Sequence, residues 1–285
     1  MRWTSGDRSN IEDRRGMSGM GVGGLGVGGL LIVLLLSWFT GVDFLSLIGG
    51  GGASVPNESV GTTGSVAATP EEERLVEMVD AVMGDAQATW EEILNGRYQR
   101  TVAVLFRDAT QSACGFAQAA TGPFYCPADR KVYLDLGFFD ELHRTLGAPG
   151  DFAQAYVLAH EVGHHVQTVL GIESQVRRRQ SADASTRNEL SVRMELQADC
   201  FAGVWGHHAN QGGSRVQLDE GDFQEGMNAA AAIGDDRLQR MQGGRIAPDR
   251  FTHGTSEQRA EWLRKGFQSG DPNQCNTFQT AAANR

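Results

Sequence analysis

The run that most constrains the fold of this chain is His160-Glu161-Val162-Gly163-His164. On an α-helix, residues four apart lie on the same face, so the two imidazoles can bind one metal ion. Two histidines at this spacing, with a glutamate between them, are typical of zinc sites that activate water for hydrolysis. The run therefore predicts His160 and His164 as zinc ligands and Glu161 as the general base.

The residues around this run favour a buried helix from Phe152 to Leu170. This stretch has no proline, and apolar residues occur on most of its sides. Asp151 is expected to be its N-cap, with Gln154 in the capping-box position, and Gly171 is expected to end it. Buried histidines and glutamates are unfavourable without partners, and a bound metal removes that penalty. The alternative is a surface helix whose histidines share no ligand.

A catalytic zinc site needs a third protein ligand. His165 points about 100° away from the metal, and Gln167 and Leu170 stand where the metzincin pattern needs glycine and histidine. Glu195 and Asp199 share a face of a second predicted helix, and the apolar residues that follow argue against a solvated acidic pair. We expect Glu195 to be the third ligand and Asp199 to accept the N–H of a ligating histidine.

Three segments together resemble the bacterial putative neutral zinc metallopeptidases. They are HEVGHHVQ at 160–167, ELQADCFAGVW at 195–205 and HGTSEQR at 253–259. The resemblance covers residues 71–285 and the glycine-rich N-terminus. It implies a metallopeptidase-like fold of the gluzincin type, in which HExxH and a downstream glutamate hold Zn²⁺. It implies no particular substrate.

An apolar segment precedes this domain. Residues 16–42 carry no charged side chain and, with the residues up to 48, are long enough to span a bilayer. Arg14 and Arg15 precede the segment, and no Lys or Arg follows before Arg74, so the positive-inside rule predicts a cytoplasmic N-terminus. The expected organisation is a short cytoplasmic N-terminus (1–20), a glycine-rich transmembrane anchor (21–48), a flexible linker (49–70) and an extracytoplasmic zinc domain (71–285).

Composition limits the partners of this chain. It has 25 basic and 35 acidic residues, a net charge of −10, and no basic stripe, which argues against nucleic-acid binding. The expected partners are a peptide or protein substrate and a cell membrane crossed once. Two GxxxG patterns, at 19–23 and 24–28, offer a face for a homodimer, although chance matches are common in so glycine-rich a segment.

The four cysteines are Cys114, Cys126, Cys200 and Cys275, and all follow the apolar segment. An even number in an oxidising compartment predicts two disulfides. Three connectivities are possible; the most local pairs Cys114 with Cys126 and leaves Cys200 with Cys275. Free buried thiols are the alternative for a cytosolic protein.

The order of the remaining elements predicts an α+β domain that is mostly helical with a small sheet. The family resemblance implies that this domain is zincin-like. Its expected strands are residues 102–106 and a hairpin at 123–135. Besides the HExxH helix, the expected helices are residues 70–96, 137–146, 187–210, 219–233 and 256–268.

Hydrolysis also needs a donor for the oxyanion that forms on the scissile carbonyl. The candidates are His253, His207, His208, Tyr156 and Tyr133, and we favour His253 because its loop directly precedes the last helix. The predicted function is a membrane-anchored peptidase in which the general base transfers the proton of water to the leaving amine.

Two other functions are compatible with the same residues. A membrane-tethered scaffold could keep a structural zinc in a protease-like fold, but it would have no need for Glu161. A cell-wall peptide amidase would use the same metal centre on a different substrate.

Overall fold

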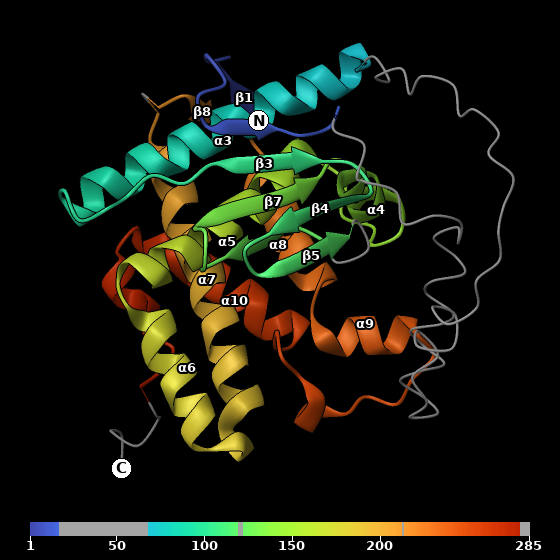
Figure 1. Cartoon of the computed structure of the whole chain (residues 1–285), viewed down its shortest axis with the longest axis vertical. Helices are drawn as coiled ribbons and strands as arrows, with labels where there is room; N and C mark the ends of the chain where they lie inside the picture. The colour runs from blue at the N-terminus through green and yellow to red at the C-terminus, as the bar shows by residue number, and fades with distance from the viewer. Residues whose placement is uncertain (17–67, 119–121, 213, 280–285) are drawn as a thin grey trace, which may run out of the picture. The chain divides into compact units, whose positions relative to one another are not determined.

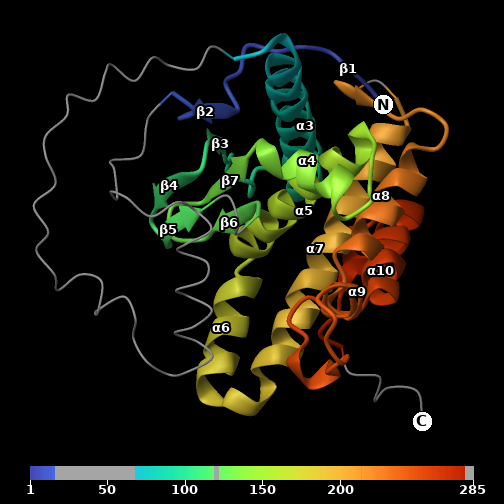
Figure 2. The ribbon, with the colours of Figure 1, turned by 90° about the vertical axis from the view of Figure 1, so that its right-hand side faces the viewer.

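The helix that carries the HExxH run lies at the centre of the domain. This helix, α5 (Asp151–Val169), is placed between a small β-sheet and a layer of helices in the computed structural model (Figures 1 and 2). The model describes residues 1–16, 68–118, 122–212 and 214–279. The helices that contact α5 most are α3 (Pro70–Leu94), α7 (Arg187–Asn210) and α8 (Asp222–Ala232); α10 (Ser256–Ser269) packs on α7 and α8.

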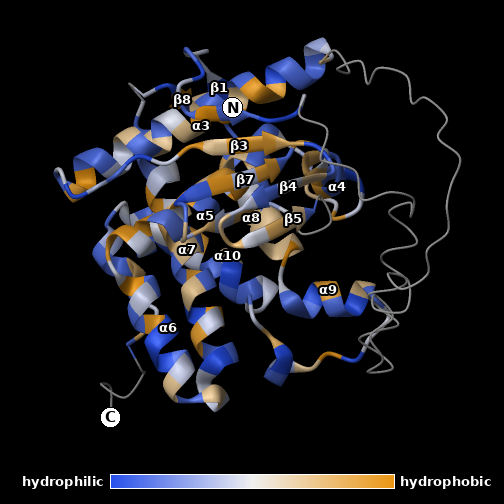
Figure 3. Cartoon of the chain, in the orientation of Figure 1, coloured by the Kyte–Doolittle hydropathy of each residue, from blue (hydrophilic) through white to orange (hydrophobic). Residues whose placement is uncertain are grey.

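The main sheet has four strands in the order β2-β3-β7-β6 within the described residues. β2 (Ile11–Asp13) and β7 (Lys131–Asp135) pair in parallel with β3 (Ala103–Phe106), and β6 (Phe124–Cys126) pairs antiparallel with β7. β6 is therefore an edge strand. β3 and β7 are rich in apolar residues (Figure 3), as expected for strands that are buried in the sheet centre. The predicted α+β class is confirmed.

Shorter elements complete the domain. Two two-stranded sheets are formed by β1 (Arg2–Trp3) with β8 (Val216–Gln217), and by β4 (Ala109–Ser112) with β5 (Gly115–Gln118). The remaining helices among the described residues are α4 (Gly137–Arg144), α6 (Ile172–Ala182), α9 (Asp235–Met241) and the 3₁₀-helices Ala184–Thr186, Pro248–Arg250 and Pro272–Cys275. The predicted helix at 219–233 begins three residues later than expected, at Asp222.

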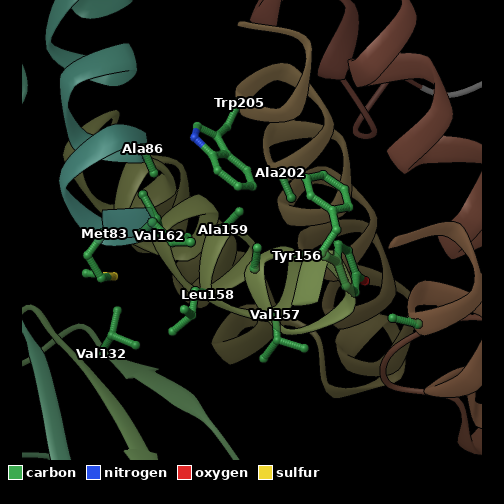
Figure 4. Packing of buried hydrophobic residues seen from close by; sticks show 14 of the residues in the cluster. Met83, Ala86, Val132, Tyr156, Val157, Leu158, Ala159, Val162, Ala202 and Trp205 are labelled. Carbon is green, nitrogen blue, oxygen red and sulfur yellow. The ribbon is translucent and has the colours of Figure 1, made fainter. Parts of the chain in front are cut away.

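Apolar side chains surround α5 on several sides. In Figure 4, Met83 and Ala86 of α3, Val132 of β7 and Trp205 of α7 approach the apolar residues of α5. On the side of α7 the two backbones come very close: a Cβ added to Gly163 would lie 2.9 Å from the carbonyl oxygen of Ala198. The glycine within the HExxH run thus permits the helix crossing that brings the residues of α5 to those of α7.

The start of α5 differs from the prediction. Its N-cap is Gly150, and the side chain of Asp151 makes no cap bond. The carboxylate of Asp151 instead accepts a hydrogen bond from the Met1 α-amine at 3.0 Å, as Asp222 does at 3.1 Å. The expected capping box with Gln154 is therefore wrong, because the N-terminal segment takes the Asp151 carboxylate.

Both predicted disulfides form. Cys114–Cys126 joins the β4–β5 turn to β6, and Cys200–Cys275 joins α7 to the 3₁₀-helix Pro272–Cys275. The described residues contain no free cysteine. The most local of the three connectivities is therefore the observed one.

The N-terminal residues belong to this same unit. Met1–Arg15 cluster with the residues from Ala68 onward, through β1, β2 and the buried side chain of Asn10. Asn10 donates to Asp80 at 2.9 Å and accepts from Gln87 at 3.0 Å. Residues 1–15, which were expected to form part of a separate segment at 1–20, therefore pack as part of the domain.

This pairing bears on the expected topology. Strands of one sheet lie on the same side of a membrane, so a cytoplasmic N-terminus does not fit an extracytoplasmic domain that contains β2. The two arginines behind that expectation are held in ion pairs, Arg14 with Glu12 at 2.6 Å and Arg15 with Asp13 at 2.6 Å. These ion pairs give the two arginines a structural role that does not depend on membrane topology.

The predicted anchor at 21–48, its GxxxG patterns and most of the predicted linker lie outside the described residues. Within the part of the chain that the structure describes, no helix has both the length and the apolar character needed to span a bilayer.

Candidate metal centre

Three of the predicted site residues converge where α5 crosses α7. His160 Nε2 lies 3.1 Å from Glu195 Oε2, and His164 Nε2 lies 3.5 Å from Glu195 Oε1. One ligand atom from each residue falls within 4.8 Å of the others. In a tetrahedral zinc site with bonds of about 2.0–2.1 Å, two ligand atoms lie about 3.3 Å apart. The two imidazoles and the carboxylate therefore fit zinc in both donor type and spacing.

The second nitrogen of His160 is held by the buried carboxylate of Asp199. Its Nδ1–H donates to Asp199 Oδ1 at 2.8 Å, and the Tyr156 hydroxyl donates to the same oxygen at 2.6 Å. Arg259 adds two bonds of 2.9 Å, one to each oxygen of Asp199. Although burial raises the pKa of Asp199, Arg259 and His160 lower it to about 2, so the carboxylate stays ionised.

The second nitrogen of His164 is held by an amide. His164 Nδ1–H donates to Gln167 Oε1 at 2.9 Å, and Gln167 Nε2 in turn donates to the Met194 carbonyl at 2.7 Å and to Gln197 Oε1 at 3.2 Å. These two donations fix which end of the Gln167 amide faces the imidazole. With Nδ1–H held in this way, each histidine can offer the lone pair of Nε2 to a metal once the Nε2 proton is lost.

The acidic groups also change the protonation of the histidines. Burial lowers the pKa of His160, but Asp199 and Glu195 outweigh it and raise this pKa to about 9. The pKa of His164 is raised as well, because Glu195 outweighs burial. A metal must displace these protons, so metal affinity rises with pH.

His165 points away from this centre, as predicted. Its Nε2–H donates to the Gln99 carbonyl at 2.5 Å, and its Nδ1 accepts from the Tyr125 hydroxyl at 3.0 Å. Burial lowers the pKa of His165, which matches a neutral ring that joins α5 to β6.

A cleft of about 550 Å³ opens beside the three candidate ligands. Glu161 borders it, is 7 % exposed, and makes no side-chain hydrogen bond to another described residue. Its carboxylate is thus available to water. The apolar residues of the lining come from β6, α4, α5, α7, α9 and the loops nearby: Pro123, Phe124, Pro127, Phe138, Val157, Met194, Ile233 and Leu238.

His253 also borders this cleft, as the choice of oxyanion donor requires. Its Nδ1 lies 3.1 Å from Asp235 Oδ1, and Asp235 Oδ2 accepts the backbone N–H groups of Thr252, His253 and Gly254 at 2.7–3.1 Å. The hydrogen bond with Asp235 raises the pKa of His253. Asp235 escaped prediction because it lies 18 residues before His253, in another helix.

The other oxyanion candidates are engaged elsewhere. His207 and His208 donate to the carbonyls of Phe267 and Gly270 at 2.7 and 3.3 Å, far along α7 from Glu195. Tyr133 donates to Asp129 at 2.6 Å. Tyr156 borders the cleft, but its hydroxyl donates to Asp199. His253 remains the best-placed of the five.

Comparison with known proteins agrees with this geometry. Residues 1–278 match the family described as "Putative neutral zinc metallopeptidase". "Uncharacterized protein YpfJ" of Escherichia coli is 49 % identical over 98 % of this chain and 99 % of its own length. "Uncharacterized protein Rv2575" of Mycobacterium tuberculosis is 43 % identical over 71 % of this chain and 70 % of its own. No solved structure matches the chain. The chain therefore belongs to the putative neutral zinc metallopeptidase family, and this membership implies Zn²⁺ as its cofactor.

Proposed function

We propose that this chain is a zinc-dependent peptidase that hydrolyses peptide bonds with water. The observation that carries the proposal is the Glu161 carboxylate, which borders the cleft directly beside the cluster of His160, His164 and Glu195. A purely structural zinc needs ligands but no additional carboxylate next to an open cleft. This arrangement supports a catalytic zinc over the structural zinc of a scaffold protein.

Each residue has a separate role in the proposed mechanism. His160, His164 and Glu195 would hold the metal, and the chemistry that zinc supplies when bound is Lewis acidity toward water and the scissile carbonyl. Glu161 accepts the proton of the attacking water and passes it to the leaving amine. Asp199 and Gln167 orient the two imidazoles, and Arg259 keeps Asp199 ionised and fixed.

His253 is the proposed donor to the oxyanion. Its ring borders the cleft, and the pairing of Nδ1 with Asp235 leaves Nε2 as the nitrogen that can donate to substrate. Because Asp235 raises the pKa of His253, the ring keeps a proton at Nε2 over a wider pH range than a free imidazole. A charged donor stabilises an oxyanion more strongly than a neutral one.

The edge strand β6 supports a peptide as the substrate. Phe124 and Tyr125 of β6 border the same cleft as Glu161. An edge strand has unpaired backbone groups that can bind an extended peptide by adding it to the sheet. Such binding recognises main-chain groups, which suits a peptidase and a cell-wall peptide amidase alike.

We also propose that the domain works in an oxidising compartment outside the cytoplasm, since it carries two disulfides. Residues 1–15 then lie in that compartment as well, because β2 is part of the domain's sheet. Attachment to the membrane through residues 21–48 stays a prediction. It requires that both ends of that segment lie on the same side of the membrane.

Metal removal and restoration test the proposed activity. The full-length protein is incubated with β-casein and, separately, with cell-wall stem peptides, and products are identified by mass spectrometry. A strong chelator should abolish cleavage, and one equivalent of Zn²⁺ should restore it in the wild type but not in His164→Ala. Cleavage of the stem peptides alone would favour the amidase, and no metal-dependent cleavage of either substrate would favour the scaffold.

A further inference from the structure

We infer that the cleft is built for a peptide bond in the interior of a chain, so that the protein is an endopeptidase that takes extended, largely apolar segments. This inference rests on the proposed peptidase function and adds the class of substrate. The supporting observation is the set of contacts that the charged residues of the cleft make within the protein.

The cationic groups of the lining are engaged within the protein. Apart from the candidate zinc ligands His160 and His164, Arg259 and His253 are the described residues of the lining that can carry positive charge. Arg259 is 3 % exposed and makes both of its short bonds to Asp199. The charge of His253 is paired with Asp235 through Nδ1, and its Nε2 is the proposed donor to the oxyanion. An exopeptidase that removes C-terminal residues needs a cation for the substrate α-carboxylate. Both cations here have a carboxylate partner in the protein itself.

Two of the three acidic groups of the lining have roles in the proposed metal centre. Glu195 lies between the two histidines, and Glu161 is the proposed base. The third acid of the lining, Glu173, accepts from Arg177 Nε at 2.8 Å, one turn further along α6. An aminopeptidase needs a carboxylate for the substrate α-amine, and Glu173 is the single residue of the lining left to test for that role among those described.

The rest of the lining favours uncharged residues on the substrate. The side chains of Phe138, Leu238 and Ile233 border the cleft from α4, α9 and the end of α8. Burying apolar substrate side chains against them gains about 25 cal/mol for each Å² removed from water. As an edge strand, β6 can bind main-chain groups of successive residues, which does not require a chain end. Together these contacts match an extended apolar segment.

The first experiment reads where cuts occur. Full-length, zinc-loaded protein is mixed with β-casein, and early products are sequenced by mass spectrometry alongside Glu161→Gln. Internal fragments with bulky apolar residues next to the cut would support the inference. Products shortened stepwise from one end would overturn it while leaving the peptidase function intact. If no product depends on Glu161, the peptidase function itself fails.

A second experiment uses a peptide that spans one mapped cut, in two forms: with free ends, and with an acetylated N-terminus and amidated C-terminus. We expect kcat/KM to agree within about threefold, because neither end is recognised. A loss of a hundredfold or more on blocking either end would show recognition of a terminus and contradict the inference.

Glu173 is tested with a matched control. Glu173→Gln and Glu189→Gln each remove one acid from a helical i,i+4 pair with arginine, but only Glu173 borders the cleft. Both variants should retain the wild-type kcat/KM on the free-ended peptide within about threefold. A large loss confined to Glu173→Gln and to peptides with a free amine would assign Glu173 as an α-amine site and make the protein an aminopeptidase.

Discussion

At the scale of single residues, Asp199 is the best-connected group of the centre. It accepts from His160, Tyr156 and, through two nitrogens, Arg259, and its side chain is fully buried. A buried carboxylate without a counter-charge is strongly unfavourable. Arg259 Nη2 lies 4.0 Å from Glu195 Oε2 and makes no hydrogen bond to it. We therefore expect Arg259 to act on the proposed metal site through Asp199 and His160.

Replacing Arg259 by Met should weaken zinc binding. The change leaves Asp199 with an uncompensated buried charge and loosens its hold on His160, and such losses weaken metal affinity by about 10- to 100-fold. The zinc Kd is measured by competition with a chromophoric chelator. Arg264→Met, at an exposed site on the same helix, is the control and should bind zinc like the wild type. Equal affinity in both variants would mean that Arg259 does not position the site.

The pair of Asp235 and His253 predicts a pH effect. A protonated His253 is lost as pH rises through its pKa, and Asp235 raises that pKa, so the basic limb of the kcat profile lies higher than for a free imidazole. Asp235→Asn removes the charge and should move this limb to lower pH. Asp236→Asn, whose carboxylate binds Ser256 and not His253, should leave the limb in place. Identical limbs in all three proteins would remove His253 from the mechanism.

At the scale of elements, the site depends on the crossing of α5 and α7. Sequence predicted both helices, because each segment contains its own ligand spacing and its own apolar residues. The N-cap of α5 was predicted wrongly, because the Asp151 carboxylate binds the distant Met1 α-amine. It predicted Asp199 for the same reason, since Asp199 lies one turn after Glu195. Gln167 lies one turn after His164, but its amide is oriented by the Met194 carbonyl of α7. The role of Gln167 beside His164 was therefore missed.

A methyl group at the crossing should disturb the site without changing any ligand. In Gly163→Ala the new Cβ would lie 2.9 Å from the Ala198 carbonyl oxygen, so α5 and α7 must separate. We expect a loss of about 1–3 kcal/mol in stability, as for other overpacked positions, together with weaker zinc binding. Thermal unfolding of the apo and zinc-loaded protein measures both. Wild-type values in both forms would show that the helices do not cross this closely.

At the scale of the whole molecule, the N-terminal segment shows where local patterns fail. Residues 11–13 have no strand signal of their own, and their pairing with 103–105 spans about ninety positions of sequence. From sequence alone, Arg14 and Arg15 indicate a membrane topology, because they are positive charges next to an apolar segment. The sequence does not show that both arginines form ion pairs within the domain. The partners Glu72 and Glu73 of Arg15 lie on α3, beyond the apolar segment.

The sheet predicts that both ends of the apolar segment lie in one compartment. Ser5→Cys and Ser185→Cys place a thiol at exposed positions of the N-terminal segment and of the domain. In intact spheroplasts, a membrane-impermeant maleimide should label both variants. Labelling of Ser185→Cys alone, with Ser5→Cys labelled only after lysis, would restore the cytoplasmic N-terminus and exclude β2 from the native sheet.

In the proposed mechanism, three residues hold zinc while a fourth, Glu161, performs the chemistry. This mechanism is tested most directly by measuring zinc content and β-casein cleavage on the same preparation of Glu161→Gln, which keeps the shape of the side chain and removes its charge. We expect about one equivalent of zinc, as in the wild type, with cleavage reduced by at least about a hundredfold. Full zinc with undiminished cleavage, or loss of the zinc itself, would contradict it.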